Sequence, residues 1–220
     1  METLDHIKAI LFDLDNTLIQ RQKSAYAFFC DIVERCYPGL EEAEKLKRAD
    51  ELYLWDGHGY TPKNELFYNL LNKYGFVCQP KDLADLWVSD LWKYTKCFPQ
   101  SKHVLSTLRK KYKIGCLTNG NPHSQRRKLE VSGLQDAFDG IRVSGEYGKG
   151  KPDPEIYLVL AKDLGVKASE CLFVGDYIQT DIVGAYNAGM TAVWIEPEIL
   201  SKTDYPVQRI FVIEDLLDFL

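Results

Sequence analysis

The segment from Lys8 to Thr17 has the sequence K-A-I-L-F-D-L-D-N-T and is the starting point for the architecture. Its first half, Lys8–Phe12, is short and almost entirely apolar, which is typical of a strand buried on both faces of a parallel sheet. Two aspartates, Asp13 and Asp15, follow this strand directly. Ligands of open α/β sheets bind beyond the carboxyl ends of the strands, so these two carboxylates are the first candidates for a functional site.

Further apolar runs of the same length predict four more buried strands: Ile114–Leu117, Ile141–Val143, Leu172–Val174 and Ala192–Ile195. Helical patterns separate most of them, including Pro122–Val131 and a helix that begins at Pro154 with Asp153 as its N-cap. A last strand at Arg209–Ile213 and a terminal helix at Glu214–Leu220 are also predicted. This alternation indicates an α/β fold with a doubly wound parallel sheet.

The alternation stops between about Ser24 and Phe98. This stretch has only helical periodicity, and its segments are Ser24–Arg35, Glu41–Leu54, Pro62–Tyr74 and Asp82–Thr95. Proline and glycine turn signals separate these segments. The sequence therefore predicts an α/β core formed by residues 1–20 and 99–220, with an all-helical cap inserted as residues 21–98.

Composition and charge exclude several classes of protein. The 220 residues are 45% hydrophobic, enough for a core without disulfide or zinc support. The formal charge is 27 − 32 = −5, which disfavours nucleic acid and anionic membranes as partners. No apolar run is long enough to span a bilayer. The first residues lack an apolar signal segment, and the six cysteines form no C-x-x-C pair, so we expect reduced thiols and a cytoplasmic location.

Polar residues follow four of the predicted strands: Asp13 and Asp15, Thr118 and Asn119, Lys151, and Asp176 and Asp181. The carboxyl ends of parallel strands meet at one edge of a sheet, so these side chains are expected to converge. Asp13, Asp15 and Asp176 would repel one another there. Mg²⁺, a hard cation that prefers oxygen ligands, would remove this repulsion. Together with the charge of Lys151, such a set is suited to phosphoryl transfer.

Four motifs resemble, in the same order, those of the haloacid dehalogenase-like hydrolase superfamily. They are D-L-D-N-T at 13–17, T-N-G at 118–120, K-P-D-P at 151–154 and G-D-x-x-x-x-D at 175–181. Two further strings also match, Q-x-x-K-L-x-x-x-G-L at 125–134 and D-I-x-G-A-x-x-A-G-M at 181–190. The insertion after the first motif stands where one subgroup has its helical, C1-type cap. The resemblance implies a Rossmann-like core with that cap.

The resemblance also implies a role for each motif residue. Asp13 corresponds to the nucleophile that forms an aspartyl-phosphate, and Asp15 to the general acid and base. Mg²⁺ would be bound by the Asp13 carboxylate, the Asp15 backbone carbonyl and Asp176. Asp181 would orient Lys151 or a metal-bound water. The phosphoryl oxygens would be contacted by Thr118, Asn119 and Lys151.

These roles predict a Mg²⁺-dependent phosphatase of small phosphate monoesters, either a sugar phosphate or a nucleoside monophosphate. Haloalkanoate dehalogenases of the superfamily lack an acid at the position of Asp15, because a halide leaving group needs no proton. The protein is expected to act as a monomer or homodimer. The alternatives are a phosphomutase of the same superfamily and a non-catalytic metabolite-binding protein that keeps the fold.

Three sequence features can each be interpreted in two ways. Lys149 is a second lysine in the third motif's loop, although Lys151 is preferred because it precedes Pro-Asp-Pro. His123 follows the second motif closely and is either a surface residue or part of the site. The segment Trp55–Tyr60 is either an ordinary loop of the cap or a loop that selects the substrate.

Overall fold

The chain divides into two compact units, Met1–Gln20 with Lys96–Leu220, and Arg21–Thr95. The computed structural model describes residues 4–195 and 207–220. Residues 96–98, predicted to end the cap, belong to the first unit. Backbone hydrogen bonds explain this difference: Gln20 N donates to Lys96 O over 2.9 Å, and Phe98 N donates to Leu18 O over 3.1 Å.

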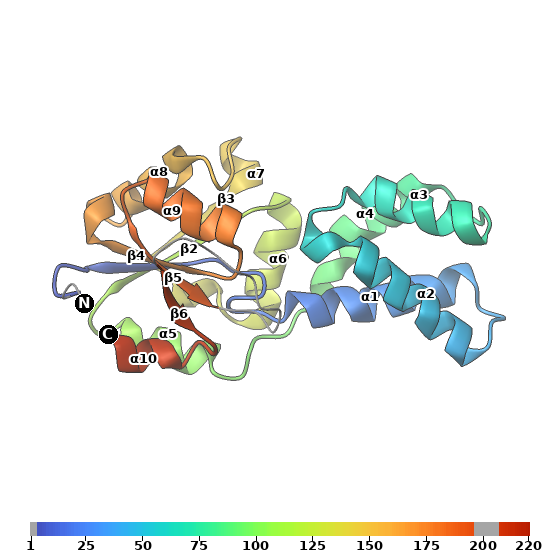
Figure 1. Ribbon diagram of the computed structural model, residues 1–220, viewed down its shortest axis with the longest axis horizontal. Helices are drawn as coiled ribbons and strands as arrows, with labels where there is room; N and C mark the ends of the chain where they lie inside the picture. The colour runs from blue at the N-terminus through green and yellow to red at the C-terminus, as the bar shows by residue number, and fades with distance from the viewer. Residues whose placement is uncertain (1–3, 196–206) are drawn as a thin grey trace. The chain divides into compact units, whose positions relative to one another are not determined.

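The first unit is built on a six-stranded sheet whose strand order is β3-β2-β1-β4-β5-β6, with every neighbouring pair parallel (Figure 1). The strands are β1 Ala9–Phe12, β2 Lys113–Thr118, β3 Gly140–Val143, β4 Cys171–Gly175, β5 Thr191–Ile195 and β6 Gln208–Ile210. All six predicted strands are confirmed, although the last is shorter than predicted. In the register, Phe12 pairs with both Cys116 and Val174, so the chain leaves β1 at the centre of the carboxyl edge.

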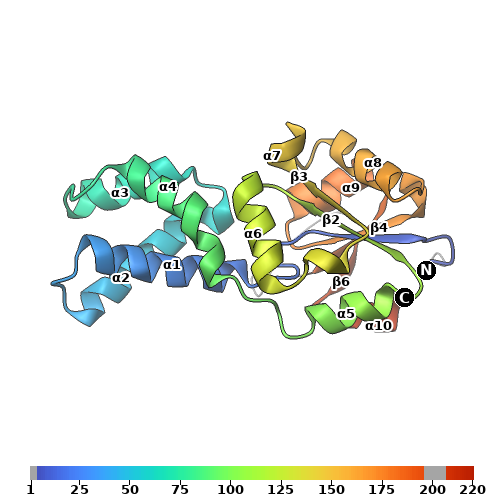
Figure 2. The same ribbon diagram turned by 180° about the vertical axis from the view of Figure 1, so that it is seen from behind.

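Helices cover both faces of this sheet, as a doubly wound fold requires. They are α5 Ser101–Leu108, α6 Pro122–Ser132, α7 Ser144–Tyr147, α8 Pro154–Asp163, α9 Val183–Asn187 and α10 Asp215–Phe219, with short turns η3 Gln135–Ala137, η4 Ala168–Glu170 and η5 Ile178–Ile182. Figure 2 shows α8 and α9 on one side of the strands and α5 and α10 on the other. Asp153 is confirmed as the N-cap residue of α8, since its side chain accepts a hydrogen bond from Glu155 N over 2.9 Å.

Alternation of side chains along each strand divides the core into two apolar layers. Ile10 and Phe12 face the layer that includes α5, α6 and α10, whereas Leu11 faces the layer formed with α8 and α9. Cys116 and Cys171 are buried, one in each layer. Each layer covers one face of the sheet with apolar side chains. The polar residues of the motifs therefore lie beyond the ends of the strands.

The second unit contains only helices: α1 Arg21–Cys36, α2 Glu42–Trp55, α3 Lys63–Tyr74 and α4 Pro80–Asp90, with short 3₁₀ turns η1 Gly57–Gly59 and η2 Leu91–Tyr94. They enclose their own apolar core, in which Phe28, Phe29 and Leu66 are buried. The predicted helix Asp82–Thr95 is displaced. Pro80 opens α4, where Gln79 and Asp82 form a capping box, and the helix ends at Asp90.

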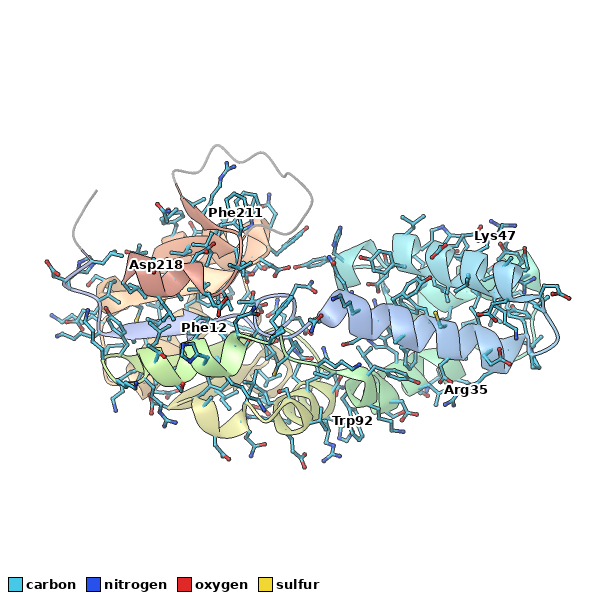
Figure 3. All side chains as sticks on the ribbon, turned by 90° about the horizontal axis from the view of Figure 1, so that it is seen from below. Phe12, Arg35, Lys47, Trp92, Phe211 and Asp218 are labelled. Atoms are coloured by element: carbon cyan, nitrogen blue, oxygen red, sulfur yellow. The ribbon has the colours of Figure 1, made fainter. Side chains whose placement is uncertain are left out.

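The surface of this unit is charged. Arg35 on α1 and Lys47 on α2 are more than half exposed, and both are labelled on its outside in Figure 3. Among the residues from 4 to 195 and from 207 to 220, no helix combines the length and the apolar character needed to cross a membrane.

A buried ion cluster ties the loop after α2 to α1 and α3. Asp56, whose side chain is 1% exposed, accepts from Arg21 Nη1 over 2.6 Å and from Lys63 Nζ over 2.7 Å. Burial alone would raise the pKa of Asp56, but Arg21 and Lys63 hold it below its ordinary value. Both cations also lie over the ring of Trp87. Trp87 therefore belongs to the packing of this unit.

The loop Trp55–Tyr60 is held by this cluster at Asp56. Three successive residues, Gly57, His58 and Gly59, have φ values of +54°, +56° and +101°. Glycine adopts this region freely, while histidine does so uncommonly. The turn exposes His58 and Tyr60 to solvent. The loop is therefore a defined turn, and its role in substrate selection stays a prediction.

Replacing Asp56 by asparagine is expected to lower the free energy of unfolding of the helical unit by about 3 kcal/mol, because two largely buried cations would lose their partner. Three of the four tryptophans lie in this unit, so urea unfolding followed by tryptophan fluorescence reports mainly on it. The difference from wild type should shrink below about pH 4, because Asp56 takes up a proton there in the unfolded chain while the folded protein, in which its pKa is lowered, still holds it ionised.

The matched control is Asp85→Asn on α4. Asp85 pairs with Lys81, but both side chains are well exposed, so this change should cost less than about 1 kcal/mol. Equal effects of the two substitutions would contradict a stabilising role for the buried cluster.

Candidate active site

The carboxyl edge of the sheet gathers the residues that follow β1, β2 and β4. These three strands are neighbours, with β1 in the middle. The backbone N–H of Asp13 continues the ladder by donating to Val174 O over 2.9 Å. The loop after β3 returns to the same edge, where Lys151 contacts Asp13. Residues that are up to 168 positions apart along the chain, from Asp13 to Asp181, are thereby brought together.

Asp13 is buried at the centre of this edge. One carboxylate oxygen, Oδ1, accepts a hydrogen bond from Lys151 Nζ over 2.6 Å, and the other accepts from the Thr17 hydroxyl over 3.3 Å. Burial raises the pKa of Asp13 to about 7, with a smaller contribution from Asp181, and Lys151 opposes this rise. Positive charge close to Asp13 favours its ionised form, and with Lys151 alone beside it the carboxyl loses its proton only near pH 7.

Lys151 supplies part of that positive charge. Its ammonium group is buried and bonds to both Asp13 and Asp181, each over 2.6 Å. Burial disfavours the ammonium, but the two carboxylates outweigh burial and raise the pKa of Lys151 well above its ordinary value. Lys149, the other lysine of the loop, is half exposed and pairs with Glu155 instead. The structure thus brings Lys151, and not Lys149, to Asp13.

Asn119 holds Lys151 by its backbone. Its side-chain Nδ2 donates to Lys151 O, and its Oδ1 accepts from Lys151 N, both over 2.8 Å. Gly150 makes this approach possible, because a Cβ there would lie 2.7 Å from Asn119 Oδ1. The side-chain amide of Asn119 thus positions Lys151, and the expected contact of Asn119 with phosphoryl oxygens stays a prediction. Both ends of the side-chain amide are already engaged.

Asp181 is held in the one-turn π-helix η5, a rare element that is frequent at functional sites. Its carboxylate accepts from Lys151, from the Thr180 hydroxyl over 3.2 Å and from Tyr177 N over 3.0 Å. Gly175 leaves room for it, since a Cβ there would lie 2.4 Å from an Asp181 oxygen. Asp181 is therefore placed to orient Lys151.

Three carboxylates are close enough to share a cation. Asp13, Asp176 and Asp181 each offer an oxygen, and these oxygens lie within 4.8 Å of one another. Burial, followed by the charges of Asp13 and Asp181, raises the pKa of Asp176 well above its ordinary value. A dication would relieve this repulsion, and oxygen donors suit Mg²⁺. The residues present therefore fit the expected metal, although Asp181 is largely occupied by Lys151 and Tyr177.

The turn after β1 depends on Asn16, whose φ is +64°. Asparagine is one of the few residues other than glycine that tolerate this region. Its side chain also hydrogen-bonds to Asp176, which opposes the raised pKa of that carboxyl. Asn16 thus shapes the turn after β1. The two aspartates of this segment contact different partners, since Asp13 bonds to Lys151 and Asp15 bonds to α6.

Asp15 is bound to two residues of α6. Lys128 Nζ lies 2.8 and 2.9 Å from its two oxygens, and Gln125 Nε2 donates to Oδ2 over 2.9 Å. Gln125 Nε2 also donates to the Thr118 hydroxyl oxygen over 2.5 Å. Sequence analysis assigned no role to Gln125 or Lys128. The available signals were the string at 125–134, which resembles one of the superfamily, and the spacing of three, which puts two polar side chains on one face of a helix.

The remaining candidates lie apart from these contacts. His123 is exposed near the start of α6.

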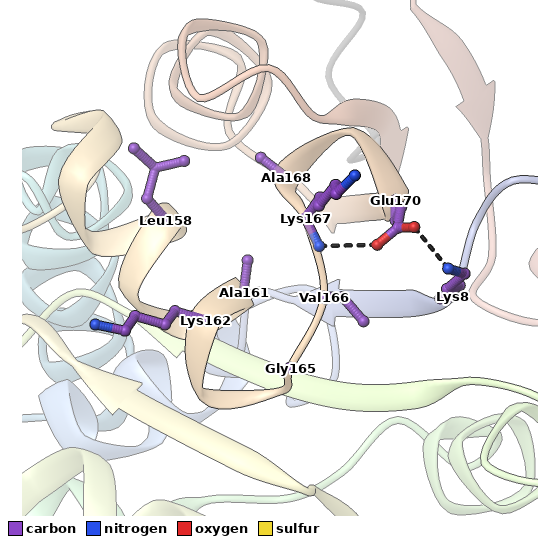
Figure 4. Close-up of a pocket in the computed structure, with 9 residues that line it drawn as sticks. All are labelled: Lys8, Leu158, Ala161, Lys162, Gly165, Val166, Lys167, Ala168 and Glu170. Carbon is purple, nitrogen blue, oxygen red and sulfur yellow. Dashed lines mark hydrogen bonds and ion pairs between the residues drawn. The ribbon is translucent and has the colours of Figure 1, made fainter.

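A hollow of about 630 Å³ lies near the amino ends of β1 and β4, at the opposite edge of the sheet (Figure 4). Lys8 and Glu170 form an ion pair over 2.6 Å at its rim. None of the carboxyl-edge residues lines this hollow.

A family model described as haloacid dehalogenase-like hydrolase matches residues 7–189. The chain is 32% identical to the N-acylneuraminate-9-phosphatase of Homo sapiens over 209 residues, covering 87% of this chain and 84% of the relative. It is 33% identical to the glyceraldehyde 3-phosphate phosphatase of Methanopyrus kandleri over 198 residues, covering 86% and 84%. Each match thus covers most of both proteins.

A solved structure supports the same fold. The HAD-hydrolase YfnB from Bacillus subtilis, which was crystallised with magnesium, superposes with a TM-score of 0.81. The match covers 97% of this chain and 98% of that protein, at 24% sequence identity. At this identity the likeness concerns the fold alone, and the chemistry has to be argued from the side chains.

Proposed function

Because the chain belongs to the haloacid dehalogenase-like hydrolases, we propose that it is a Mg²⁺-dependent phosphatase of small phosphate monoesters. The observation that carries this proposal is the position of Asp13, buried and bonded to Lys151, with a second aspartate two residues later. The first carboxylate is a nucleophile and the second an acid and base. An ion-paired carboxylate needs no further activation to attack phosphorus.

The reaction proceeds in two displacements. In the first, an Asp13 oxygen bonds to phosphorus, the ester P–O bond breaks, and the leaving oxygen takes a proton from Asp15. In the second, water attacks the phosphorus of the aspartyl-phosphate and gives its proton to Asp15, which releases inorganic phosphate and restores Asp13. Thr118 donates to the phosphoryl group, and Lys151 neutralises its charge.

Mg²⁺ would be held by the Asp13 carboxylate, the backbone carbonyl of Asp15 and the Asp176 carboxylate. When bound, it supplies positive charge that offsets the charge of the transferring phosphoryl group. Asp181 orients Lys151 in this scheme.

The two relatives support a sugar phosphate as substrate rather than a nucleoside monophosphate. Their names identify phosphorylated sugar derivatives, an acylneuraminate and a triose. The proposed enzyme is cytoplasmic and acts as a monomer or homodimer. Phosphate release across a panel of sugar phosphates and nucleoside monophosphates tests this choice.

We expect kcat/KM at least about tenfold higher for the best sugar phosphate than for any nucleotide, a difference of about 1.4 kcal/mol. A nucleotide as the best substrate would reverse the choice. An isomerised ester without free phosphate would support the phosphomutase alternative. Binding without turnover of any ester would support a non-catalytic protein.

Mg²⁺ binding is expected to depend on pH. The pKa of Asp13 rises from 3.8 to about 7 in the folded, metal-free protein, so the folded state keeps a proton that the unfolded state loses between these values. Metal-free stability should therefore fall as pH rises through this window. Because Mg²⁺ needs the ionised carboxylate, the increase in Tm on adding Mg²⁺ should be larger at about pH 8 than at about pH 5.5.

Differential scanning calorimetry with and without Mg²⁺ measures this difference. Asp176→Asn is the informative variant, since it removes one proposed ligand and should reduce the Mg²⁺-dependent increase at both pH values. A shift in Tm that is the same at both pH values in the wild type would argue against a site built on Asp13.

A further inference from the structure

We propose that Gln125 and Lys128, together called the Asp15 clamp, are positioning residues that set the orientation of Asp15 for proton transfer. This inference rests on the proposed role of Asp15 as acid and base. The two clamp residues come from α6, more than a hundred positions away from Asp15 along the chain.

Lys128 fixes the plane of the Asp15 carboxylate. Its Nζ lies 2.8 Å from Oδ1 and 2.9 Å from Oδ2, and these nearly equal distances place the ammonium between the two oxygens. These bonds are made to the ionised carboxylate, the form that Asp15 reaches when it gives its proton to the leaving oxygen, and rotation of the carboxylate would break at least one of them. Charge-assisted hydrogen bonds of this kind are about twice as strong as neutral ones, so this orientation is held firmly.

Gln125 connects Asp15 with Thr118. The Asp15 carboxylate accepts hydrogen bonds, so the nitrogen of the Gln125 amide, and not its oxygen, faces Oδ2. The same nitrogen donates to Thr118 Oγ1 over 2.5 Å. The Thr118 oxygen then acts as acceptor, and its hydroxyl hydrogen is left to donate to a phosphoryl oxygen. One amide group thus aligns both the acid–base residue and a phosphate-binding hydroxyl.

Burial distinguishes the clamp from an ordinary surface ion pair. Lys128 and Gln125 are 4% and 2% exposed, whereas the Asp15 side chain is 22% exposed. Burying an ammonium group is expensive, and an apolar residue at position 128 would fill the same space without that expense. A buried lysine that bonds to a partly accessible aspartate is explained by control of that aspartate better than by stability.

The leaving group provides a direct test. An alkyl phosphate releases an alkoxide that needs a proton from Asp15, whereas p-nitrophenyl phosphate releases a stable phenolate that hardly needs one. In single turnovers with excess enzyme and Mg²⁺, Lys128→Met should slow alcohol release from glycerol 3-phosphate by about 100-fold or more. Release of p-nitrophenol should slow by less than about tenfold, because positioning of Asp15 contributes little to that step.

Further variants separate positioning from folding. Lys128→Arg retains two donors for the carboxylate and should recover at least about tenfold of the lost rate. Gln125→Leu tests the other half of the clamp without changing any charge, and it should also slow glycerol 3-phosphate more than p-nitrophenyl phosphate. Arg127→Met is the matched control on α6, since Arg127 pairs with Glu130, and both rates should stay at the wild-type level.

Asp15→Ala separates failure of the inference from failure of the proposed function. If Asp15→Ala slows both substrates equally, Asp15 is not the acid–base residue and the proposed mechanism is wrong. If Asp15→Ala discriminates between the substrates while Lys128→Met and Gln125→Leu slow both equally, the clamp is structural and the inference alone is overturned.

Discussion

Asp13→Asn is expected to abolish turnover, with a loss of phosphate release on the order of 10⁴-fold or more, the scale seen when a covalent nucleophile is removed. An amide has nearly the same shape as a carboxylate but carries no negative charge and is a poor nucleophile. The variant should nevertheless fold. It removes one of three crowded carboxylates, and Lys151 keeps its bond to Asp181.

Two measurements check this expectation. Phosphate release from p-nitrophenyl phosphate with Mg²⁺ gives the rate, and acid quenching with radiolabelled substrate detects the covalent phosphoryl group. Asp218→Asn is the control, because Asp218 is exposed on α10 (Figure 3) and is not one of the carboxyl-edge residues. A folded Asp13→Asn protein that keeps about a tenth or more of the wild-type rate would exclude the covalent role.

Lys151→Met is expected to reduce both activity and stability. The activity should fall by at least about 100-fold, because a preorganised positive charge beside the phosphoryl group is lost. The free energy of unfolding should fall by about 3 kcal/mol, since Asp13 and Asp181 would be left without their shared buried partner. The pKa of Asp13 is about 7, so its carboxyl is charged above that pH, and the loss of stability should be larger at about pH 8 than at about pH 5.5.

Lys149→Met is the matched control for this variant. Lys149 stands two residues earlier in the same loop, is half exposed and pairs with Glu155, so its loss should change activity by less than about twofold. Urea unfolding and steady-state kinetics on the two variants make the comparison. If the Lys149 variant were the inactive one, the assignment of the third motif would have to move to that lysine.

The strands were predictable because each is a short local pattern. Ala9–Phe12 and Leu172–Val174 contain no polar residue, and burial on both faces of a parallel sheet requires such runs. The change to helical periodicity after the first motif likewise indicates the inserted unit. Its end was misplaced by three residues because a backbone bond between Gln20 and Lys96, invisible in any local pattern, joins residues 96–98 to the sheet unit.

The candidate site was predictable as a set of residues but not as a set of contacts. Topology alone brings Asp13, Lys151 and Asp181 to one edge, because parallel strands end on the same side of the sheet. Asn119 shows where this reasoning stops. The resemblance implies a contact with phosphate, which stays a prediction, whereas the bond from its side-chain amide to the Lys151 backbone depends on the close approach at Gly150.

The contacts of the Asp15 clamp were also not predictable from the sequence. The strands, the inserted helices and the motif residues all follow from periodicity and motif spacing, which are local properties of the chain. Which side chain meets which follows from packing: α6 covers one face of the sheet, and only that placement brings Lys128 against Asp15. Hydrogen bonds and ion pairs act over about 3 Å, so a partner 113 residues away is set by the folded arrangement of helix and sheet.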